Sequence, residues 1–279
     1  MVSSQSMAVD AFDAVAERFD GRFGHLLSVA AQRRAVRREL LRCFPAGSRL
    51  LELGGGTGDD AVFLAQRGRR VVMTDGSERM VRVATDRVRA SGCEQMVETF
   101  PVLIEEIGRL VDLKPSDIPF DGVFSNFAAL NCVEHLAPVG RALAGLVRPG
   151  GLALLVVFGP FPIGEVMVQL GRGRVSRAFR RFRGRGSADA QLNGRHFRVW
   201  YPGPREVARA FEPFFRLRGK RGIGVLVPPS DAEPDISAFP RVVRFMEATD
   251  RVIGRPMAIL GDHVLLTFER TQVPIAAVT

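Results

Sequence analysis

Glycines alternate along one short stretch of the chain, and an acid precedes them. Glu52 is followed by Gly54, Gly56 and Gly58 at every second position, at the end of the apolar run 49–53. Glycine tolerates positive φ and lets a ligand approach the backbone closely, while free N–H groups at a helix start favour an anionic or polar group. Dinucleotide-binding folds use a related turn, but there the third glycine stands three positions after the second, not two.

A second acid, Asp75, ends the next apolar run, 70–74. A carboxylate at the carboxyl end of a strand can accept hydrogen bonds from both hydroxyls of a ribose. Aspartate is also a favoured cap for a helix that follows it. The two roles are compatible, and the sequence leaves both open.

Alternating strand and helix patterns surround these residues. The strand 49–53, the glycine turn, a helix 59–66 and the strand 70–74 form a βαβ unit, which implies a parallel sheet with helices on its faces. Two helices are expected within 10–44. Further helices are predicted at 78–89, 139–146, 204–211 and 242–253, and further strands at 99–103, 122–125, 152–158, 215–219 and 263–269. We therefore expect an α/β fold with one doubly wound, mostly parallel sheet of seven strands.

Four motifs in this order resemble the class I S-adenosylmethionine-dependent methyltransferases of the small-molecule type. Residues 51–58 (LELGGGTG) resemble the family's first motif, and residues 71–80 (VVMTDGSERM) resemble the segment that carries its ribose-binding acid. Residues 120–126 (FDGVFSN) and 146–151 (LVRPGG) resemble the fourth-strand motif and the turn before the fifth strand. The resemblance covers roughly residues 10–160. It implies a Rossmann-like methyltransferase fold, with S-adenosyl-L-methionine as cofactor and S-adenosyl-L-homocysteine as product.

The pattern of elements along the chain also predicts the arrangement of the domain. Residues 1–279 would form a single methyltransferase domain, with an N-terminal helical cap at 10–44. An arginine-rich, partly helical insertion at 160–200, after strand five, would lie on the substrate side. Cap and insertion together would cover the carboxyl edge of the sheet, because ligands of open α/β folds bind there and the reacting centre needs shielding from water.

The same resemblance assigns the cofactor contacts. Asp75 would hold the ribose, and Glu52 would lie near the methionine amino group. Met80 would pack on the adenine, and Asn126 would lie beside the sulfonium. Glu105 or Glu106 could contact the adenine amine, and we prefer Glu105. Glu105 could equally be a solvated acid of the loop. The full cofactor set is Phe19, Glu52, Gly54, Gly56, Asp75, Gly76, Met80, Ile104, Glu105 and Asn126.

A general base is missing where many members of the family have one. They place a histidine soon after the fourth strand, where this chain reads ALNC at 129–132. Our catalytic candidates are therefore His196 and Tyr201, where the insertion returns to the sheet, while His263 is expected to be structural. Alignment of nucleophile, methyl and sulfur can supply much of the rate without a base if the nucleophile is already anionic or an unprotonated amine.

Aromatic side chains are expected to line the substrate pocket, which favours an apolar or aromatic substrate. Phe19 would face the same pocket. The predicted substrate-binding residues are Phe12, Phe127, Asn131, Phe161 and Tyr201.

The formal net charge is +9, and the excess is concentrated in one segment. Residues 160–200 contain nine arginines against two acids. We expect most of these arginines to be solvated, with Arg195 or Arg198 near the pocket, although the segment could bind an acidic substrate or partner. The basicity would also suit a nucleic-acid methyltransferase. The loop after strand four, SNFA at 125–128, lacks the Asn/Asp-Pro-Pro-aromatic pattern of base amino-methylases, so that alternative is less favoured. A non-catalytic binding module is the third alternative, and the intact glycine turn with Asp75 argues against it.

Composition excludes several classes of protein. The longest apolar run, 152–163, is broken by Gly159 and Pro160 and is shorter than the ~18 to 20 residues that a membrane span requires. The first twelve residues are polar and small, so we expect no export signal and a cytoplasmic protein. Cys43, Cys93 and Cys132 are widely separated, which argues against a disulfide framework and structural zinc. The oligomeric state and the atom that is methylated stay open.

Overall fold

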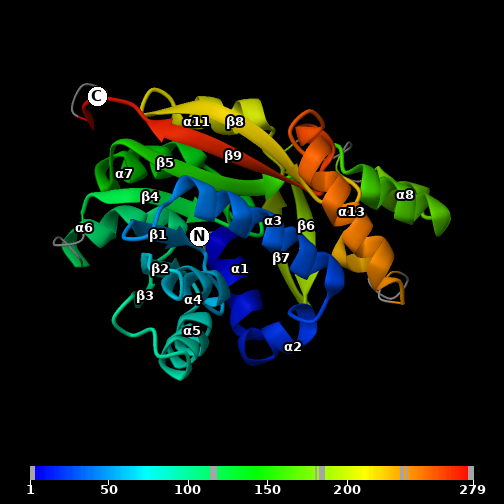
Figure 1. Ribbon diagram of the computed structural model, residues 1–279, viewed down its shortest axis with the longest axis horizontal. Helices are drawn as coiled ribbons and strands as arrows, with labels where there is room; N and C mark the ends of the chain where they lie inside the picture. Colours follow the sequence, from blue (N-terminus) through cyan, green and yellow to red (C-terminus); the bar gives the residue numbers. More distant parts are fainter. Residues whose placement is uncertain are drawn as a thin grey trace.

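A seven-stranded sheet in the order β3-β2-β1-β4-β5-β9-β8 runs through the protein (Figure 1). The computed structural model describes residues 4–113, 118–179, 181, 186–232, 236 and 238–275. The strands of the sheet are β1 (Arg49–Leu53), β2 (Arg70–Asp75), β3 (Val97–Pro101), β4 (Phe120–Ser125), β5 (Val147–Phe158), β8 (Phe215–Ile223) and β9 (His263–Arg270). Strands β1 to β5 are parallel, and β9 is antiparallel to both β5 and β8. The predicted doubly wound, mostly parallel sheet is thus confirmed.

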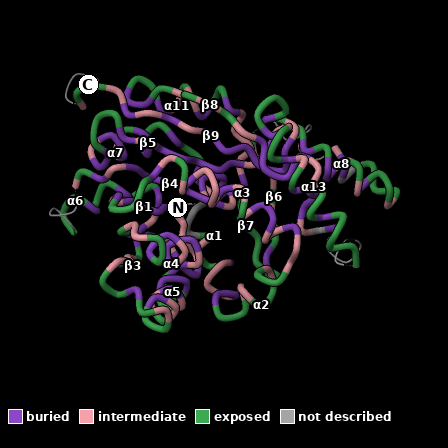
Figure 2. The backbone as a smooth tube through the Cα atoms, in the orientation of Figure 1, coloured by how far each residue is buried: buried purple, intermediate pink, exposed green. Residues whose placement is uncertain are grey.

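Helices cover both faces of the sheet, because successive strand residues point to opposite sides. Leu51 and Leu53 pack in one buried cluster with α7 (Leu136–Leu146) and α11 (Pro204–Phe211). Leu50 packs in a second cluster with α3 (Leu27–Cys43), α4 (Asp59–Ala65) and α5 (Glu78–Ala90). Figure 2 shows the resulting buried stretches along the strands between these two layers.

Short elements complete the fold. The remaining helices are α1 (Ser4–Asp13), α2 (Phe19–Phe23), α6 (Leu110–Leu113), α8 (Ile163–Gly171), α9 (Val175–Ala178) and α13 (Pro240–Ile253). The 3-10 turns are η1 (Ala16–Arg18), η2 (Ile104–Arg109), η4 (Ala129–Cys132), η5 (Ser230–Ala232) and η6 (Ala258–Leu260). Within the described ranges, no helix combines the length and the hydropathy that crossing a membrane would need.

The segment between β5 and α11 contains a hairpin that the sequence analysis did not predict. Strands β6 (Ser187–Leu192) and β7 (Arg195–Trp200) pair antiparallel. They are joined by Asn193 and Gly194, whose φ angles of 50° and 80° suit a tight hairpin turn. Of the nine arginines in this segment, those at 180, 183 and 185 lie outside the described residues.

The hairpin and α1 both lie at the carboxyl edge of the sheet. Buried residues of β7 pack with Ala8 and Ala11 of α1 and with Met80 at the start of α5. Asn131, in the turn after β4, donates to the carbonyl oxygen of Trp200 and accepts from the N–H of Phe158 at 3.1 Å. These contacts hold the hairpin above the ends of β4 and β5.

Candidate functional site

The glycine turn after β1 leaves open space beside its backbone. Gly54 and Gly56 have φ angles of 64° and 58°, which L side chains rarely adopt. At Gly54 a Cβ atom would lie 2.4 Å from the Cβ of Ala129, whereas at Gly56 it would meet nothing within 4 Å. The turn therefore combines close packing under Gly54 with room for a ligand at Gly56.

Asp75 is fixed by backbone hydrogen bonds next to that space. Its Oδ2 accepts from the N–H of Gly56 at 2.8 Å, and its Oδ1 accepts from the N–H of Ser77 at 2.9 Å. Burial raises the pKa of Asp75, against the effect of these two bonds. The side-chain cap of α5 is Ser77, whose Oγ accepts from the N–H of Met80 at 3.0 Å. Each carboxylate oxygen of Asp75 keeps a lone pair for another donor.

Glu52 is a buried carboxylate with one oxygen left unsatisfied by the described part of the chain. Its side chain belongs to a residue only 2% exposed, and no described residue hydrogen-bonds to its Oε2. Burial, together with the nearby carboxylates of Asp60 and Asp75, raises the pKa of Glu52 well above its usual range, and Arg33 and Arg37 oppose this only in part. An unsatisfied buried carboxylate costs free energy, so this position suits a cationic ligand group.

Arg33, on α3, brings a complementary cation to the same place. Its guanidinium pairs with Asp59 and lies 4.9 Å from the ring centroid of Phe127. Burial lowers the pKa of Arg33. Its Nε is buried without a hydrogen-bond partner in the described part of the chain. The site thus holds an unpartnered donor and an unpartnered acceptor, which together suit the two ends of an amino acid.

The turn after β4 is fixed and strained. The Nδ2 of Asn126 donates to Oδ2 of Asp60 at 2.7 Å, and its Oδ1 accepts from the N–H of Phe127 at 2.8 Å. Arg37 donates from Nε to Oδ1 of Asp60 at 2.6 Å. Phe127 and Ala128 have φ angles of 47° and 61° without being glycines. Such strain is concentrated at functional sites, and here it positions the Phe127 ring beneath Arg33.

The part of the site that is predicted to bind the adenine lies around Gly76. A Cβ atom there would lie 2.6 Å from Cδ2 of Leu103 and 2.8 Å from Cγ2 of Val9, so α1 and the turn before η2 close over this glycine. Met80 and Ile104 are buried nearby in the fold. Glu105 is exposed over most of its surface, and the pKa of its carboxyl group is raised because neighbouring residues shield that group from part of the solvent. Its contact with the adenine amine stays a prediction.

Aromatic rings gather at the carboxyl edge of the sheet. We call this group the aromatic wall; its members are Phe12, Phe19, Phe127, Phe158, Phe197 and Tyr201. The Phe12 ring centroid lies 6.3 Å from that of Phe19 and 5.8 Å from that of Phe197. Further along, the Phe158 ring centroid lies 5.5 Å from that of Tyr201.

The other two predicted substrate-binding residues differ in exposure. Asn131 is buried, and its amide serves the backbone of the hairpin and of β5. Phe161 is exposed on the segment that leads into α8, and its N–H donates to the carbonyl oxygen of Ile259.

The two catalytic candidates lie in different environments. His196 and Arg198 are exposed on the outer side of β7, while the neighbouring Phe197 faces α1. Arg195 is exposed at the start of the strand, on the same side as Phe197. The nearest polar contact of His196 is Gln191, at 3.3 Å between the two Nε2 atoms. Tyr201 is half-buried in the aromatic wall. Of the two, Tyr201 is the one that faces the interior.

His263 joins this wall, although the sequence suggested only a structural role. Its ring stacks on Phe158 at 5.1 Å and meets Phe127 edge-on at 6.2 Å. Nδ1 lies 3.3 Å from Oδ2 of Asp262, and the other carboxylate oxygen, Oδ1, pairs with Arg181 at 2.7 Å. Burial would raise the pKa of Asp262, but His263 and Arg181 hold it well below its usual range. No described residue hydrogen-bonds to the Nε2 of His263.

A family model described as a methyltransferase domain matches residues 50–151. The malonyl-[acyl-carrier protein] O-methyltransferase of Halorhodospira halophila (strain DSM 244 / SL1) is 30% identical over 273 residues, which cover 92% of this chain and 76% of that protein. The chain belongs to the class I S-adenosylmethionine-dependent methyltransferases. S-adenosylmethionine is the cofactor of this methyltransferase family, and the donor and acceptor groups at Asp75, Glu52 and Arg33 fit it.

Other relatives match this methyltransferase over a shorter region. The demethylmenaquinone methyltransferase of Clavibacter sepedonicus is 31% identical over 54% of this chain and 58% of its own length. The tRNA 5-carboxymethoxyuridine methyltransferase of Escherichia coli (strain K12) is 26% identical over 53% of this chain and 56% of its own length. The chain therefore spans a little over half the length of these two relatives.

Solved structures share the whole fold of this methyltransferase. The structure titled DhpI-SAH complex has a TM-score of 0.58 and 17% sequence identity, and the match covers 98% of this chain and all of that one. At this identity the likeness establishes the fold alone.

Proposed function

We propose that this chain transfers a methyl group from S-adenosylmethionine to a small molecule by direct displacement. The observation that carries the proposal is the set of unpartnered groups beside the glycine turn, above all the buried Oε2 of Glu52. When bound, S-adenosylmethionine supplies a methyl group on a positively charged sulfur.

Four groups would hold that cofactor. Asp75 would accept the two ribose hydroxyls with the lone pairs that its backbone bonds leave free. Glu52 would accept the ammonium of the methionine part, and the Nε of Arg33 would donate to its carboxylate. The open space at Gly56 would let the backbone approach the ligand.

The substrate would lie against the aromatic wall. Phe12, Phe127 and Tyr201 are half-buried aromatic side chains of this wall, and aromatic linings suit an apolar or aromatic molecule better than a highly charged one. A nucleophile held between this wall and the methyl group would gain rate from alignment.

Two groups in this wall can take the proton that a neutral nucleophile releases. Tyr201 is one candidate. His263 is the other, because its Nδ1 faces Asp262 and its Nε2 has no partner among the described residues. A neutral imidazole whose Nδ1–H donates to a carboxylate keeps the Nε2 lone pair as a base. The exposed position of His196 makes it a weaker candidate.

A nucleic-acid substrate is the second candidate function, which the basic insertion and the tRNA methyltransferase relative favour. Arg181 of the insertion is nevertheless committed to other partners. It is buried between Glu165 and Asp262, at 2.7 Å from each carboxylate. A paired, buried guanidinium does not contact phosphates, but Arg174, Arg195 and Arg198 of the insertion are exposed. We favour the small molecule because of the aromatic wall.

The test is transfer of labelled methyl from S-adenosylmethionine to two pools, one of small metabolites and one of unmodified tRNA. We expect labelled product in the apolar or acidic fraction of the metabolite pool and none in the tRNA. The Asp75→Ala variant serves as the inactive control. Label in the tRNA pool alone would reverse the assignment.

A further inference from the structure

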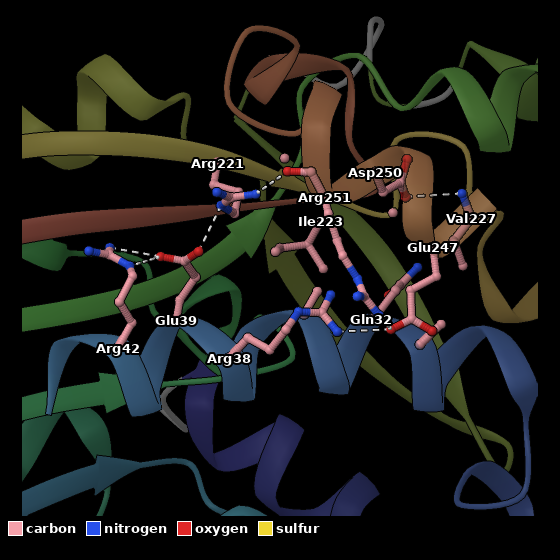
Figure 3. A pocket seen from close by; sticks show the side chains of 14 residues that line it. Gln32, Arg38, Glu39, Arg42, Arg221, Ile223, Val227, Glu247, Asp250 and Arg251 are labelled. Carbon is pink, nitrogen blue, oxygen red and sulfur yellow. Dashed lines mark hydrogen bonds and ion pairs between the residues drawn. The ribbon is translucent and has the colours of Figure 1, made fainter. Parts of the chain in front are cut away.

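Helix α13 has an inward face whose charges are all engaged. Glu247 accepts from Nη2 of Arg34 at 2.7 Å and from Nη1 of Arg38 at 2.9 Å, both on α3. Asp250 accepts from the backbone N–H groups of residues 225–227. Figure 3 shows Arg38, Glu247 and Asp250 around the cavity between α3, β8 and α13. The inward face therefore fixes the helix against α3 and the segment 225–227.

The outward face of α13 is apolar and bare. Val242, Phe245 and Val252 are 47%, 70% and 77% exposed. At 100° per residue these three fall within one stripe about 80° wide. A second stripe beside it is basic, because both acids of this helix are buried on the inward face. The exposed arginines of this second stripe are Arg241 and Arg244, and Arg255 is exposed just beyond the end of the helix. Arg251 instead pairs with Glu247 at 3.6 Å.

Helix α8 has the same character. Ile163, Met167 and Leu170, at spacings of four and three, are 36%, 67% and 44% exposed. Its buried residues, Glu165 among them, face the protein. Arg174 is exposed just beyond its end.

The two helices are joined by shared contacts. Asp250 of α13 binds the backbone of 225–227, and Gly164 of α8 lies so close to Pro228 that an added Cβ would be 3.4 Å from its Cα. The N–H of Phe161 donates to Ile259 of η6, which is itself exposed. Figure 1 shows α8 and α13 at one end of the molecule, opposite α6 and β3. We name the exposed apolar and basic residues of α8, η6 and α13 the α8–α13 surface.

We propose that the α8–α13 surface binds the face of an anionic lipid bilayer. An apolar stripe edged by arginines is the pattern by which a helix lies at a membrane interface, with apolar side chains among the acyl chains and arginines on the headgroup phosphates. Exposed apolar stripes on neighbouring elements are the kind of feature that marks an interaction site. A two-fold contact with a second copy would bring two arginine rows into one interface, and like charges there oppose association.

This placement would connect the membrane to the site. Four residues separate Phe158, in the aromatic wall, from Ile163, the first residue of α8. The chain therefore runs directly from the aromatic wall into a helix of the proposed membrane-facing surface. The binding itself does not depend on the proposed methyl transfer.

The test is co-sedimentation of the full chain with vesicles of phosphatidylcholine alone and with 30% phosphatidylglycerol. We expect binding to the anionic vesicles at low salt, and weaker binding as salt screens the arginines. The double variant Arg241→Gln/Arg244→Gln should lower the partition coefficient by about 25-fold, at about fivefold per arginine. The matched control, Arg82→Gln/Arg89→Gln on the exposed side of α5, removes the same charge elsewhere and should have little effect.

Two substitutions of apolar residues test whether side chains insert into the bilayer, separately from the attraction of the arginines. Phe245→Ser should weaken binding about tenfold, because the ring leaves the acyl region, while Val111→Ser, which changes an exposed residue of α6, should not. Three results would overturn the proposal. They are no binding to anionic vesicles at low salt, an equal loss in a variant and its control, and a dimer of the free chain that Phe245→Ser converts to monomer.

Discussion

Replacing Glu52 by glutamine probes the site at its least satisfied group. The change keeps the shape of the side chain and removes a buried charge that no described residue hydrogen-bonds through Oε2. We expect the free variant to be more stable than the wild type by about 1 kcal/mol or more at neutral pH, because it no longer holds an ionisable group beside Asp60 and Asp75.

The same substitution should weaken cofactor binding. A charge-assisted hydrogen bond to the ligand ammonium contributes roughly 1.5 to 3 kcal/mol, so Glu52→Gln should weaken S-adenosylhomocysteine binding by about 10- to 150-fold. The pKa of Glu52 is raised well above 4.5 in the free protein, and an ammonium ligand favours the ionised carboxylate, so binding at a pH near or below that raised pKa releases a proton. Affinity should therefore rise with pH through the raised pKa.

Isothermal titration calorimetry measures both effects. In wild type, the observed enthalpy should differ between phosphate and Tris at the same pH, because the released proton is taken up by buffers of different ionisation heat. The Glu52→Gln variant should show no such difference. Glu94→Gln, an exposed change, serves as control. Unchanged affinity in a folded Glu52→Gln variant would refute the role we give to this carboxylate.

Three further predictions follow from other parts of the structure. Asp75→Ala should lose two charge-assisted bonds to the ribose, each worth roughly 1.5 to 3 kcal/mol, and unchanged calorimetric affinity would remove Asp75 from the site. Asp262→Asn should destabilise the protein by about 3 to 5 kcal/mol in urea unfolding, because Arg181 loses a buried partner. In wild type the pKa of Asp262 is lower in the folded than in the unfolded protein. Ionised Asp262 therefore stabilises the fold above its unfolded pKa near 3.8, and this stabilisation is lost as pH falls toward the folded pKa. If the free energy of unfolding of wild type fell no faster with acid than that of the variant, this reasoning would be contradicted. Gly194→Ala should cost about 1 kcal/mol, since φ is 80° there, and a silent substitution would argue against the turn.

The sequence predicted the sheet well because its signals are local. The glycine turn, the acid at 75 and the apolar runs each lie within a few residues of the element that they define. The β6–β7 hairpin was missed although Asn193-Gly194 is a strong hairpin signal. The surrounding arginines had favoured a helix or a solvated loop.

Local sequence signals could not identify the site residues whose neighbours in the fold lie far away in the sequence. Arg33 lies on a helix before the first strand of the sheet, and only the folded structure brings its Nε to the neighbourhood of Glu52. His263 was assigned a structural role because nothing near it in the sequence marks Phe127 or Phe158 as neighbours. Exposure of His196 depends on which side of β7 faces α1, and that register is set by packing.

A crystal structure of the chain with S-adenosylhomocysteine would test the central assignment most directly. We predict the ribose hydroxyls on the carboxylate of Asp75, the ammonium at Oε2 of Glu52 and the carboxylate at Nε of Arg33. A ligand bound instead in the cavity between α3, β8 and α13, with the glycine turn unchanged and empty, would contradict the account.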